Sequence, residues 1–331
     1  MKVSIIIPHF NGLSILRTCL ASLVSHDRKP DQMIVVDNGS TDGSMDLVPG
    51  EFPEVEFVRL GRNTGFTGAN NAGIEAATGD FIVLLNNDCI VEKYWLENLL
   101  ARMEDQSVAS VTSSMRNIND IEVMDSAGGE IDWMGFSRDI GKGERASLHR
   151  KPRDVPFPCG GAVMIRRSAL PHPSRLFWKA LFIYQEDLDL GFELVRTGWR
   201  VVYEPSAVVR HMHSATAGRG SFLKEYHCIR NRFLVLRKHF DPQTFNTLKP
   251  VLRRWQTLWL GASVARRRFV LARAILKGTS DGMTMPVEFF EASLPLSEVF
   301  IRHAIIPAGA GKVKRNLYEK AERVMRQGIR G

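Results

Sequence analysis

Apolar runs and amphipathic segments alternate through the first 115 residues of the chain. Runs rich in β-branched residues predict strands at residues 3–7, 33–37, 55–60, 81–85 and 108–112. Between these strands, apolar residues recur at helical spacing over residues 14–24, 69–77 and 94–103. Strands that alternate with helices are typical of βαβ units, and the sequence therefore predicts an α/β domain with a mainly parallel sheet.

The pattern continues less regularly up to residue 240. Residues 116–157 are polar and rich in glycine, which predicts loops and short strands over the active face. Further strands are predicted at 163–165 and 201–203, and helices at 188–196 and 222–239. Because proline interrupts regular structure, we place the end of this domain near Pro242 and Pro250.

Apolar residues beyond Pro250 recur at spacings of four and three. They are Val251, Trp255, Leu258, Ala262, Ala265, Phe269, Ala272 and Leu276. This spacing predicts one amphipathic helix over residues 251–277 with arginines off its apolar face. Such a helix can lie in a membrane interface, or pack its apolar face on the main domain or on a partner subunit. A second basic helix is predicted over residues 313–327.

Charge is distributed unevenly. Residues 241–331 carry 16 Lys and Arg against 7 Asp and Glu, so they account for +9, while the total of +8 leaves the first 240 residues at −1. A basic segment of this kind suggests an anionic partner. The chain contains no motif that reads bases, so no nucleic acid is expected. The basic segment can contact a membrane surface or form a solvated, charged helical tail.

The cysteine pattern and the lengths of the apolar runs indicate the cellular compartment. The four cysteines, Cys19, Cys89, Cys159 and Cys228, form no CxxC pair, which favours a reducing compartment and argues against structural zinc. The apolar run before Pro8 is too short for a signal peptide, and no stretch approaches the ~18 apolar residues of a membrane span. We predict a cytoplasmic protein, with a peripheral position on the cytoplasmic face of the membrane as the arrangement that a basic helix favours.

Acidic and amide residues follow two of the apolar runs. Asn86-Asn87-Asp88 comes directly after residues 81–85, and Glu186-Asp187 comes after another short apolar stretch. Residues just past the carboxyl ends of strands line the ligand crevice of an α/β sheet. One carboxylate there can hold Mg²⁺ or Mn²⁺, and another can act as a general base. The combination suits a nucleotide-dependent transferase.

Polar turns also follow the first three strands. Asp37, at the end of the second, could accept hydrogen bonds from a ribose or a base edge. A nicotinamide enzyme would have an acid here too, but residues 8–12 lack the GxGxxG loop that it requires. Arg62 and the glycine-rich residues 63–73 offer a cation and free helical N–H groups to a diphosphate.

Taken in order, these segments resemble the nucleotide-sugar-binding half of family-2 glycosyltransferases. The matching segments are 4–8, 35–44, 63–73, 79–80 and 84–88, and then 159–167, 186–190 and His211 in the acceptor half. The resemblance implies a GT-A fold, an inverting mechanism and a divalent metal, Mg²⁺ or Mn²⁺. We therefore predict a GT-A domain over 1–240 and a basic helical C-terminal extension over 241–331. Within the domain, 1–115 would bind the nucleotide sugar and 116–240 would form the acceptor and catalytic half.

The resemblance also implies roles for single residues. Asp88 takes the last position of the metal-binding DxD motif, in which Asn86 replaces the first acid, and His211 is preferred over His213 as the second metal ligand. Asp187 is the expected base, and Glu186 would place the acceptor or hold Asp187. The expected nucleotide-sugar-binding residues are Pro8, His9, Asn11, Asp37, Asn38, Arg62, Asn63, Gly68 and Asn87.

The expected function is transfer of a sugar from a nucleotide-diphosphate donor to a hydroxyl of a lipid-linked or cell-envelope glycan. Among subgroups the chain looks most like bacterial rhamnosyltransferases. The QxxRW signature of processive synthases is absent, because Val251 stands where its glutamine would be, so non-processive transfer is expected. The missing DxD acid leaves one alternative, a catalytically inactive nucleotide-sugar or glycan-binding protein of the same fold. The sequence is compatible with a homo-oligomer as well as with a monomer.

Overall fold

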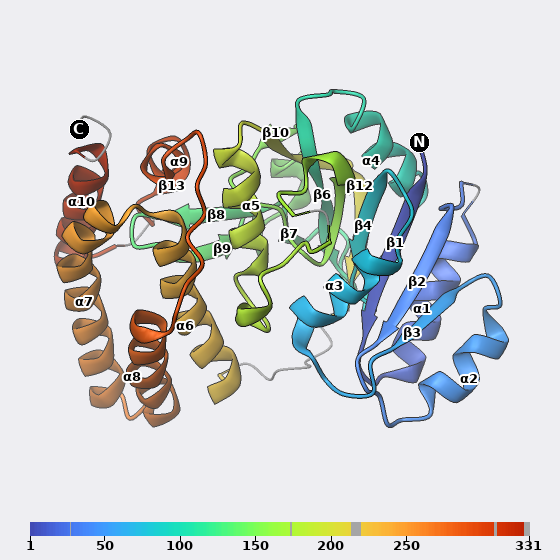
Figure 1. Cartoon of the computed structure of the whole chain (residues 1–331), viewed down its shortest axis with the longest axis horizontal. Helices are drawn as coiled ribbons and strands as arrows, with labels where there is room; N and C mark the ends of the chain where they lie inside the picture. The colour runs from blue at the N-terminus through green and yellow to red at the C-terminus, as the bar shows by residue number, and fades with distance from the viewer. Residues whose placement is uncertain (27, 173, 213–219, 308–309, 328–331) are drawn as a thin grey trace. The chain divides into compact units, whose positions relative to one another are not determined.

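The apolar runs of the first unit of the molecule form one ten-stranded sheet (Figure 1). This computed structural model describes residues 1–331 except 27, 173, 213–219, 308–309 and 328–331. The strands are β1 (Val3–His9), β2 (Gln32–Asp37), β3 (Glu56–Arg59), β4 (Phe81–Leu85), β5 (Cys89–Val91), β6 (Val108–Asn117), β7 (Met124–Ser126), β10 (Arg153–Asp154), β11 (Ala162–Arg166) and β12 (Arg200–His211). Their order is β10-β12-β6-β11-β4-β1-β2-β3, with β5 on β12 and β7 on β6.

Strand directions follow the prediction of a mainly parallel sheet. β1 is parallel to both β2 and β4, and β2 is parallel to β3. β11 runs antiparallel to β4 and β6, whereas β12 is parallel to β6. The α/β prediction is therefore confirmed, with β11 as an antiparallel insertion in the middle of the sheet.

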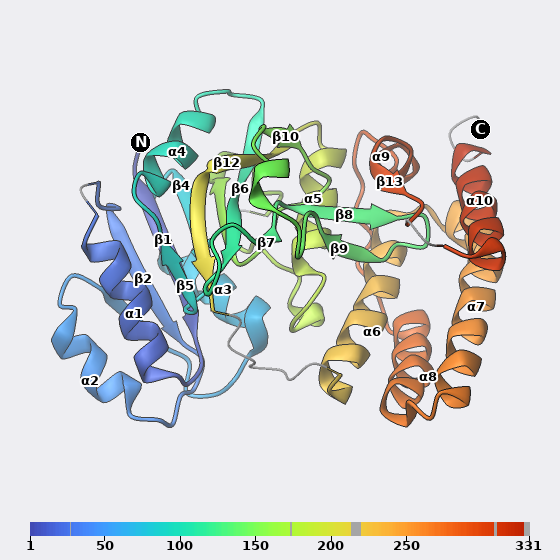
Figure 2. The ribbon, with the colours of Figure 1, turned by 180° about the vertical axis from the view of Figure 1, so that it is seen from behind.

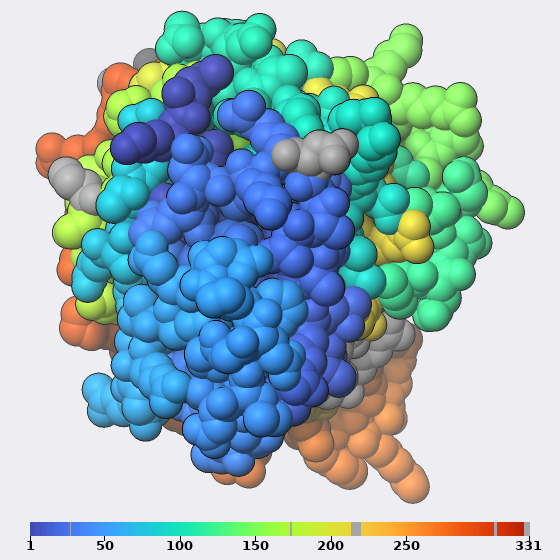
Figure 3. Space-filling model, turned by 90° about the vertical axis from the view of Figure 1, so that its right-hand side faces the viewer, coloured from blue at the N-terminus to red at the C-terminus, as the bar shows by residue number. Residues whose placement is uncertain are grey.

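Helices cover both faces of this sheet. They are α1 (Leu13–Val24), α2 (Ser44–Glu51), α3 (Gly65–Ala76), α4 (Trp95–Arg102) and α5 (Glu186–Arg196). Figures 1 and 2 show α1 and α3 on opposite faces, and Figure 3 shows the surface that the N-terminal segments form. Ile5 and Ile7 of β1 join Leu16 and Leu20 of α1 in the apolar core. Burial of such side chains stabilises the fold by ~1.5–3 kcal/mol each.

Two close approaches fix the loops at the carboxyl ends of the strands. Gly39 has φ +86°, and a Cβ there would lie 2.8 Å from backbone atoms of Arg62. Gly65 has φ +78°, and a Cβ there would lie 2.4 Å from the carbonyl oxygen of Phe182. Only glycine fits both the conformation and the space. The chain around Phe182 consequently rests on the start of α3.

The second unit comprises Glu130–Arg138, Val195–Gly198 and Ala215–Gly331. Its strands β8 (Gly129–Asp132), β9 (Ser137–Asp139) and β13 (Ala304–Ile305) pair in the order β13-β8-β9. Its helices are α6 (Phe222–His239), α7 (Pro242–Ala265), α8 (Phe269–Thr284), α9 (Leu296–His303) and α10 (Lys312–Gln327). The helices predicted at 222–239 and 313–327 are confirmed, while α9 and β13 had no recognisable pattern.

The prediction of one continuous helix over 251–277 is wrong. Pro250 lies inside α7, which ends at Ala265, and α8 begins only at Phe269. Arg267 has φ 55°, and the N–H groups of Arg267 and Arg268 donate to the carbonyls of Val264 and Ser263. These two bonds form the usual helix-ending turn, which normally contains glycine. Because arginine takes the left-handed position in place of glycine, the sequence does not indicate that a helix ends here.

Parts of the predicted apolar face are used inside the second unit. Val251 and Trp255 of α7 and Ala272 of α8 are buried. The Trp255 ring lies 5.1 Å from that of Tyr318, centroid to centroid. Among the described residues, no helix is both long and apolar enough to span a bilayer.

One buried amide in α3 ties down a distant loop, and its loss should be costly. Asn71 is 1% exposed; its Oδ1 accepts hydrogen bonds from the N–H groups of Leu176 and Phe177, and its Nδ2 donates to the Phe177 carbonyl. Asn71→Ala leaves these groups without that partner, so we expect the free energy of unfolding to fall by about 3 kcal/mol in urea titrations. The exposed Asn119→Ala should change it by under about 0.5 kcal/mol. Equal midpoints for both variants would contradict this role.

Candidate functional site

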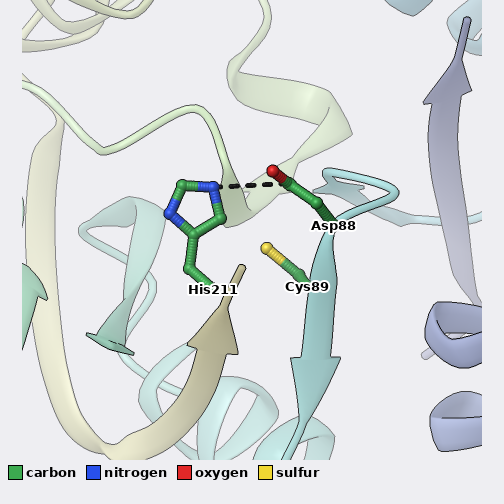
Figure 4. A group of neighbouring side chains, drawn as sticks. All are labelled: Asp88, Cys89 and His211. Carbon is green, nitrogen blue, oxygen red and sulfur yellow. Dashed lines mark ion pairs between the residues drawn. The ribbon is translucent and has the colours of Figure 1, made fainter. Parts of the chain in front are cut away.

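The end of β12 places an imidazole beside the acid that follows β4. β12 pairs with β5 so that His211 stands opposite Cys89, and the N–H of Met212 donates to the carbonyl of Asp88 at 2.9 Å. His211 Nε2 consequently lies 3.3 Å from Asp88 Oδ1 (Figure 4). Asp88 and His211, the expected metal ligands, are therefore adjacent. His213, the alternative to His211, lies outside the described residues.

A second carboxylate holds the other side of the imidazole. His211 Nδ1 lies 2.5 Å from Oδ2 of Asp125, a buried residue of β7, and Asp125 Oδ1 lies 3.2 Å from Lys142 Nζ. Burial lowers the pKa of His211, but hydrogen bonds and charge from Asp125 and Asp88 outweigh it and raise the pKa to about 9. A carboxylate behind a ligating histidine sets the orientation of its ring. Sequence reasoning missed Asp125, whose only signal was an acid in a segment expected to cover the active face.

The donor atoms around His211 suit a hard divalent cation. Ligand atoms of Asp88, Cys89 and His211 all lie within 4.8 Å of one another (Figure 4). Burial and then the charge of Asp88 raise the pKa of Cys89 well above its usual value, and its Sγ donates to the Gly161 carbonyl at 3.6 Å. Cys89 is therefore a thiol. The Asp88 carboxylate, and the His211 imidazole once it releases the proton on Nε2, are the groups that fit Mg²⁺ or Mn²⁺ together with substrate oxygens.

A chain of hydrogen bonds through buried His9 supports the side chain of Asn87, the residue before Asp88. The Asn87 amide donates to Nδ1 of His9 at 2.9 Å, so the other ring nitrogen, Nε2, carries a proton and faces Ser44 Oγ at 3.0 Å. Ser44 Oγ donates in turn to Asp42 Oδ1 at 2.6 Å. Burial lowers the pKa of His9, which favours the neutral ring that this chain requires. At 1% exposure, His9 supports Asn87 from inside and does not present its ring at the surface.

The loops after β1, β2 and β3 meet through amide side chains. Asn38 Oδ1 accepts from the Thr64 N–H at 2.7 Å, and its Nδ2 donates to Asn63 Oδ1 at 3.2 Å. Asn11 Oδ1 accepts from the Thr41 N–H at 2.8 Å. These predicted donor-binding residues therefore shape the loops through internal bonds.

The other predicted donor-binding residues differ in accessibility. Asp37 is buried at the end of β2, and its Oδ1 accepts from the Ser40 N–H at 2.9 Å. Arg62 is exposed, and Pro8 is half-buried at the end of β1. Gly68 is half-buried in α3, where a Cβ would lie 2.4 Å from Oγ1 of Thr64, the residue that caps the same helix. Of these four residues, Arg62 has the side chain that a ligand can reach most freely.

The acid pair begins α5 after a strained stretch of backbone. Phe182, Tyr184 and Gln185 have φ of 64°, 69° and 71°, which L-residues seldom adopt. Such outliers cluster at functional sites because the surrounding structure must hold them in place. Asp187 Oδ1 accepts from the Leu188 N–H at 2.8 Å. The stretch thus turns the chain sharply into the first turn of α5.

The surroundings of the two acids differ, and so do the effects on their pKa values. Burial and then the charge of Asp187 raise the pKa of Glu186 to about 8. Burial raises the pKa of Asp187 to about 6, because hydrogen bonds from the Leu188 and Gly160 N–H groups limit the rise while Asp139 adds to it. Glu186 is 7% exposed, and its Oε2 has no hydrogen-bond partner among the described residues. The environment therefore favours the protonated form of Glu186, while backbone N–H groups favour the carboxylate form of Asp187.

The glycine pair joins the two parts of the site. Gly160 N–H stabilises the Asp187 carboxylate, and the next residue, Gly161, accepts the Asn86 N–H at 2.8 Å. A Cβ on Gly161 would lie 2.9 Å from the Met115 side chain, so a larger residue would force a shift. Asp187 and the loop that carries Asn86 and Asp88 are thus connected through consecutive backbone groups.

The family model described as Glycosyl transferase family 2 matches residues 4–172, just over half of the chain. The chain belongs to this family. A pre-mycofactocin glycosyltransferase of Mycobacterium tuberculosis is 30% identical over 212 residues, which cover 64% of this chain and 43% of that protein. An N-acetylglucosaminyl-diphospho-decaprenol L-rhamnosyltransferase of the same species is 28% identical over 237 residues, covering 64% of this chain and 77% of that protein. The chain spans less than half of the first of these relatives.

Solved structures share the fold. GalNAc-T7 with UDP, GalNAc and Mn²⁺ matches with a TM-score of 0.61 at 19% identity, covering 77% of this chain and 51% of that chain. The mannosyltransferase PcManGT from Pyrobaculum calidifontis with GDP-Man and Mn²⁺ matches with a TM-score of 0.53 at 17% identity, covering 99% and 86%. These similarities confirm the predicted GT-A fold.

The contact between Asp125 and His211 should matter for metal binding. Asp125→Asn removes the charge behind the imidazole, and we expect Mn²⁺ to bind about 10–100-fold more weakly, measured from the free-ion EPR signal. Asp46→Asn, an exposed acid of α2, should leave the affinity unchanged. An unchanged Mn²⁺ affinity in a folded Asp125→Asn protein would show that Asp125 does not support metal binding.

Proposed function

We propose that this chain is a metal-dependent, inverting glycosyltransferase that moves one sugar from a nucleoside-diphosphate donor to a hydroxyl group. The observation that carries the proposal is geometric. His211 Nε2 lies 3.3 Å from Asp88 Oδ1, and in a separate acid pair the Asp187 carboxylate accepts the Leu188 N–H while the Oε2 of buried Glu186 has no hydrogen-bond partner among the described residues. Family membership supports the reaction class. The fold neighbours that contain UDP or GDP-Man with Mn²⁺ support the type of donor.

Asp88 and His211 would hold Mg²⁺ or Mn²⁺. Because Asn86 replaces the first acid of the DxD motif, Asp88 is the acid that remains in it. When bound, the ion neutralises charge on the departing diphosphate. Asp125 keeps the His211 ring in place, and the His9 chain keeps Asn87 in place. Arg62 is exposed at the loop after β3, where its guanidinium can contact donor phosphate oxygens. The remaining expected donor residues would shape the loops that surround the nucleotide.

Asp187 is the proposed general base. The acceptor oxygen forms a bond to the anomeric carbon on the face opposite the diphosphate, the bond to the diphosphate oxygen breaks, and the hydroxyl proton passes to Asp187. The N–H groups of Leu188 and Gly160 hold the carboxylate in position before the acceptor binds. Glu186 is buried beside Asp187, and its surroundings favour the protonated form, so we assign it the role of placing the acceptor or holding Asp187.

We also propose a class of acceptor and a candidate sugar for the donor. The relative named as an N-acetylglucosaminyl-diphospho-decaprenol L-rhamnosyltransferase supports a lipid-linked or cell-envelope glycan as acceptor, and rhamnose as a candidate sugar. We propose non-processive transfer by residues 1–240, with 241–331 as a basic extension. The protein would act on the cytoplasmic face of the membrane, in peripheral contact through residues within 251–277.

Nucleotide release from a panel of UDP-, GDP- and dTDP-sugars with Mn²⁺ or Mg²⁺ tests the proposal. We expect metal-dependent turnover of one donor with extracted lipid-linked acceptors, reduced about 10²–10⁴-fold in Asp187→Asn because the proton then has no acceptor. Asp46→Asn serves as the matched control. Donor binding without any turnover would instead support the inactive binding protein, and no donor binding would contradict the site.

The pH dependence should report on Asp187. A base acts in its deprotonated form, so kcat/KM should be steady above the pKa of about 6 and fall about tenfold per unit below it. Circular dichroism at each pH separates this effect from unfolding. A rate that stays constant from pH 7.5 to 5 would contradict the assignment of Asp187 as the base.

A further inference from the structure

The turn between α7 and α8 is formed by three consecutive arginines, Arg266, Arg267 and Arg268, and all three are exposed. Within the second unit this turn lies at the end opposite to α9 and α10 (Figure 1). The left-handed conformation of Arg267 reverses the chain here, so the three guanidinium groups share one tip. No ion pair is formed by any of them within the described part of the chain.

Apolar side chains surround the same tip without cover. Phe269 is 64% exposed, Val270 52% and Val264 48%. Farther along the same helices, Trp255 and Ile275 are buried within the unit. Leu258 and Leu276 of the same helices are also exposed, at 46% and 59%, but at the tip the exposed apolar side chains stand next to three arginines, and this combination is what an outside surface can use.

Charge along the α7–α8 hairpin has one sign between residues 242 and 280. Residues 242–280 contain no acidic residue, whereas Arg253, Arg254, Arg266, Arg267, Arg268, Arg273 and Lys277 lie in this segment. Guanidinium groups form paired hydrogen bonds with phosphate oxygens, and each basic residue near an anionic membrane strengthens binding about fivefold. A soluble polyanion would use the arginines alone. Exposed Phe269 and Val270 beside them favour a partner that also offers an apolar layer.

We propose that this tip docks on an anionic phospholipid bilayer. Arg266, Arg267 and Arg268 contact lipid phosphates, and Phe269 and Val270 enter the boundary between headgroups and acyl chains. The hairpin meets the membrane by its end, and not by one helix lying flat along residues 251–277. This proposal gives a specific surface to the peripheral contact in the proposed function, and it does not depend on catalysis.

Sedimentation of the full chain with large unilamellar vesicles tests the docking surface. Wild-type protein should bind vesicles of 70% phosphatidylcholine and 30% phosphatidylglycerol, and bind pure phosphatidylcholine far more weakly. Replacing all three tip arginines by glutamine should weaken binding to anionic vesicles about 100-fold. Phe269→Ser with Val270→Ser should remove the binding that persists in high salt.

A matched control separates docking from general charge. Arg302, Arg323 and Arg326 of α9 and α10 are exposed, and their replacement by glutamine removes the same charge elsewhere. Equal loss in this control, absence of vesicle binding by the wild type, or duplex DNA binding as tight as vesicle binding would each overturn the proposal. Vesicle binding needs no donor or acceptor. Its absence would therefore not count against the proposed transferase activity, and an absence of that activity would not count against membrane docking.

Discussion

The site depends on one imidazole held between two buried carboxylates. His211 reaches this position because β12 runs parallel to β6 and also pairs with β5, which starts directly after Asp88. Asp125 comes from β7, the strand that pairs with the other edge of β6 near its end. Three strands thus deliver three polar side chains to one corner, and a change in any pairing would separate them. Buried charges of this kind are stable only when their partners are in place.

The second constraint is the separation of two acids that are neighbours in sequence. Ionising both members of such a pair is unfavourable. The N–H groups of Leu188 and Gly160 favour the ionised form of Asp187, while burial favours the protonated form of Glu186. Since Gly161 also accepts the Asn86 N–H, the same glycine pair orients Asp187, the proposed base, and the loop that carries Asp88, the proposed metal ligand. A short, strained stretch before α5 is the local cost of this arrangement.

Periodicity was sufficient to predict the parallel strands and most helices, because burial on a sheet imposes it directly. The adjacency of Asp88 and His211 was predicted from the order of matching segments. Asp125 was not, because an acid on a three-residue strand has no motif and its partner is distant in the chain. The burial of His9 could not be predicted either, because a residue at the end of a strand can face the crevice or the interior. The α7–α8 turn escaped prediction because Arg267 occupies a position that glycine usually marks.

The central claim is that Asp88 and His211 together hold the divalent ion. Anomalous diffraction from crystals grown with Mn²⁺ and a nucleoside diphosphate would test it most directly. The account predicts a manganese peak about 2 Å from an Asp88 carboxylate oxygen and from His211 Nε2, with Asp125 still bonded to Nδ1. A nucleotide-bound manganese ion coordinated by other residues, with His211 still turned only toward the two carboxylates, would contradict it.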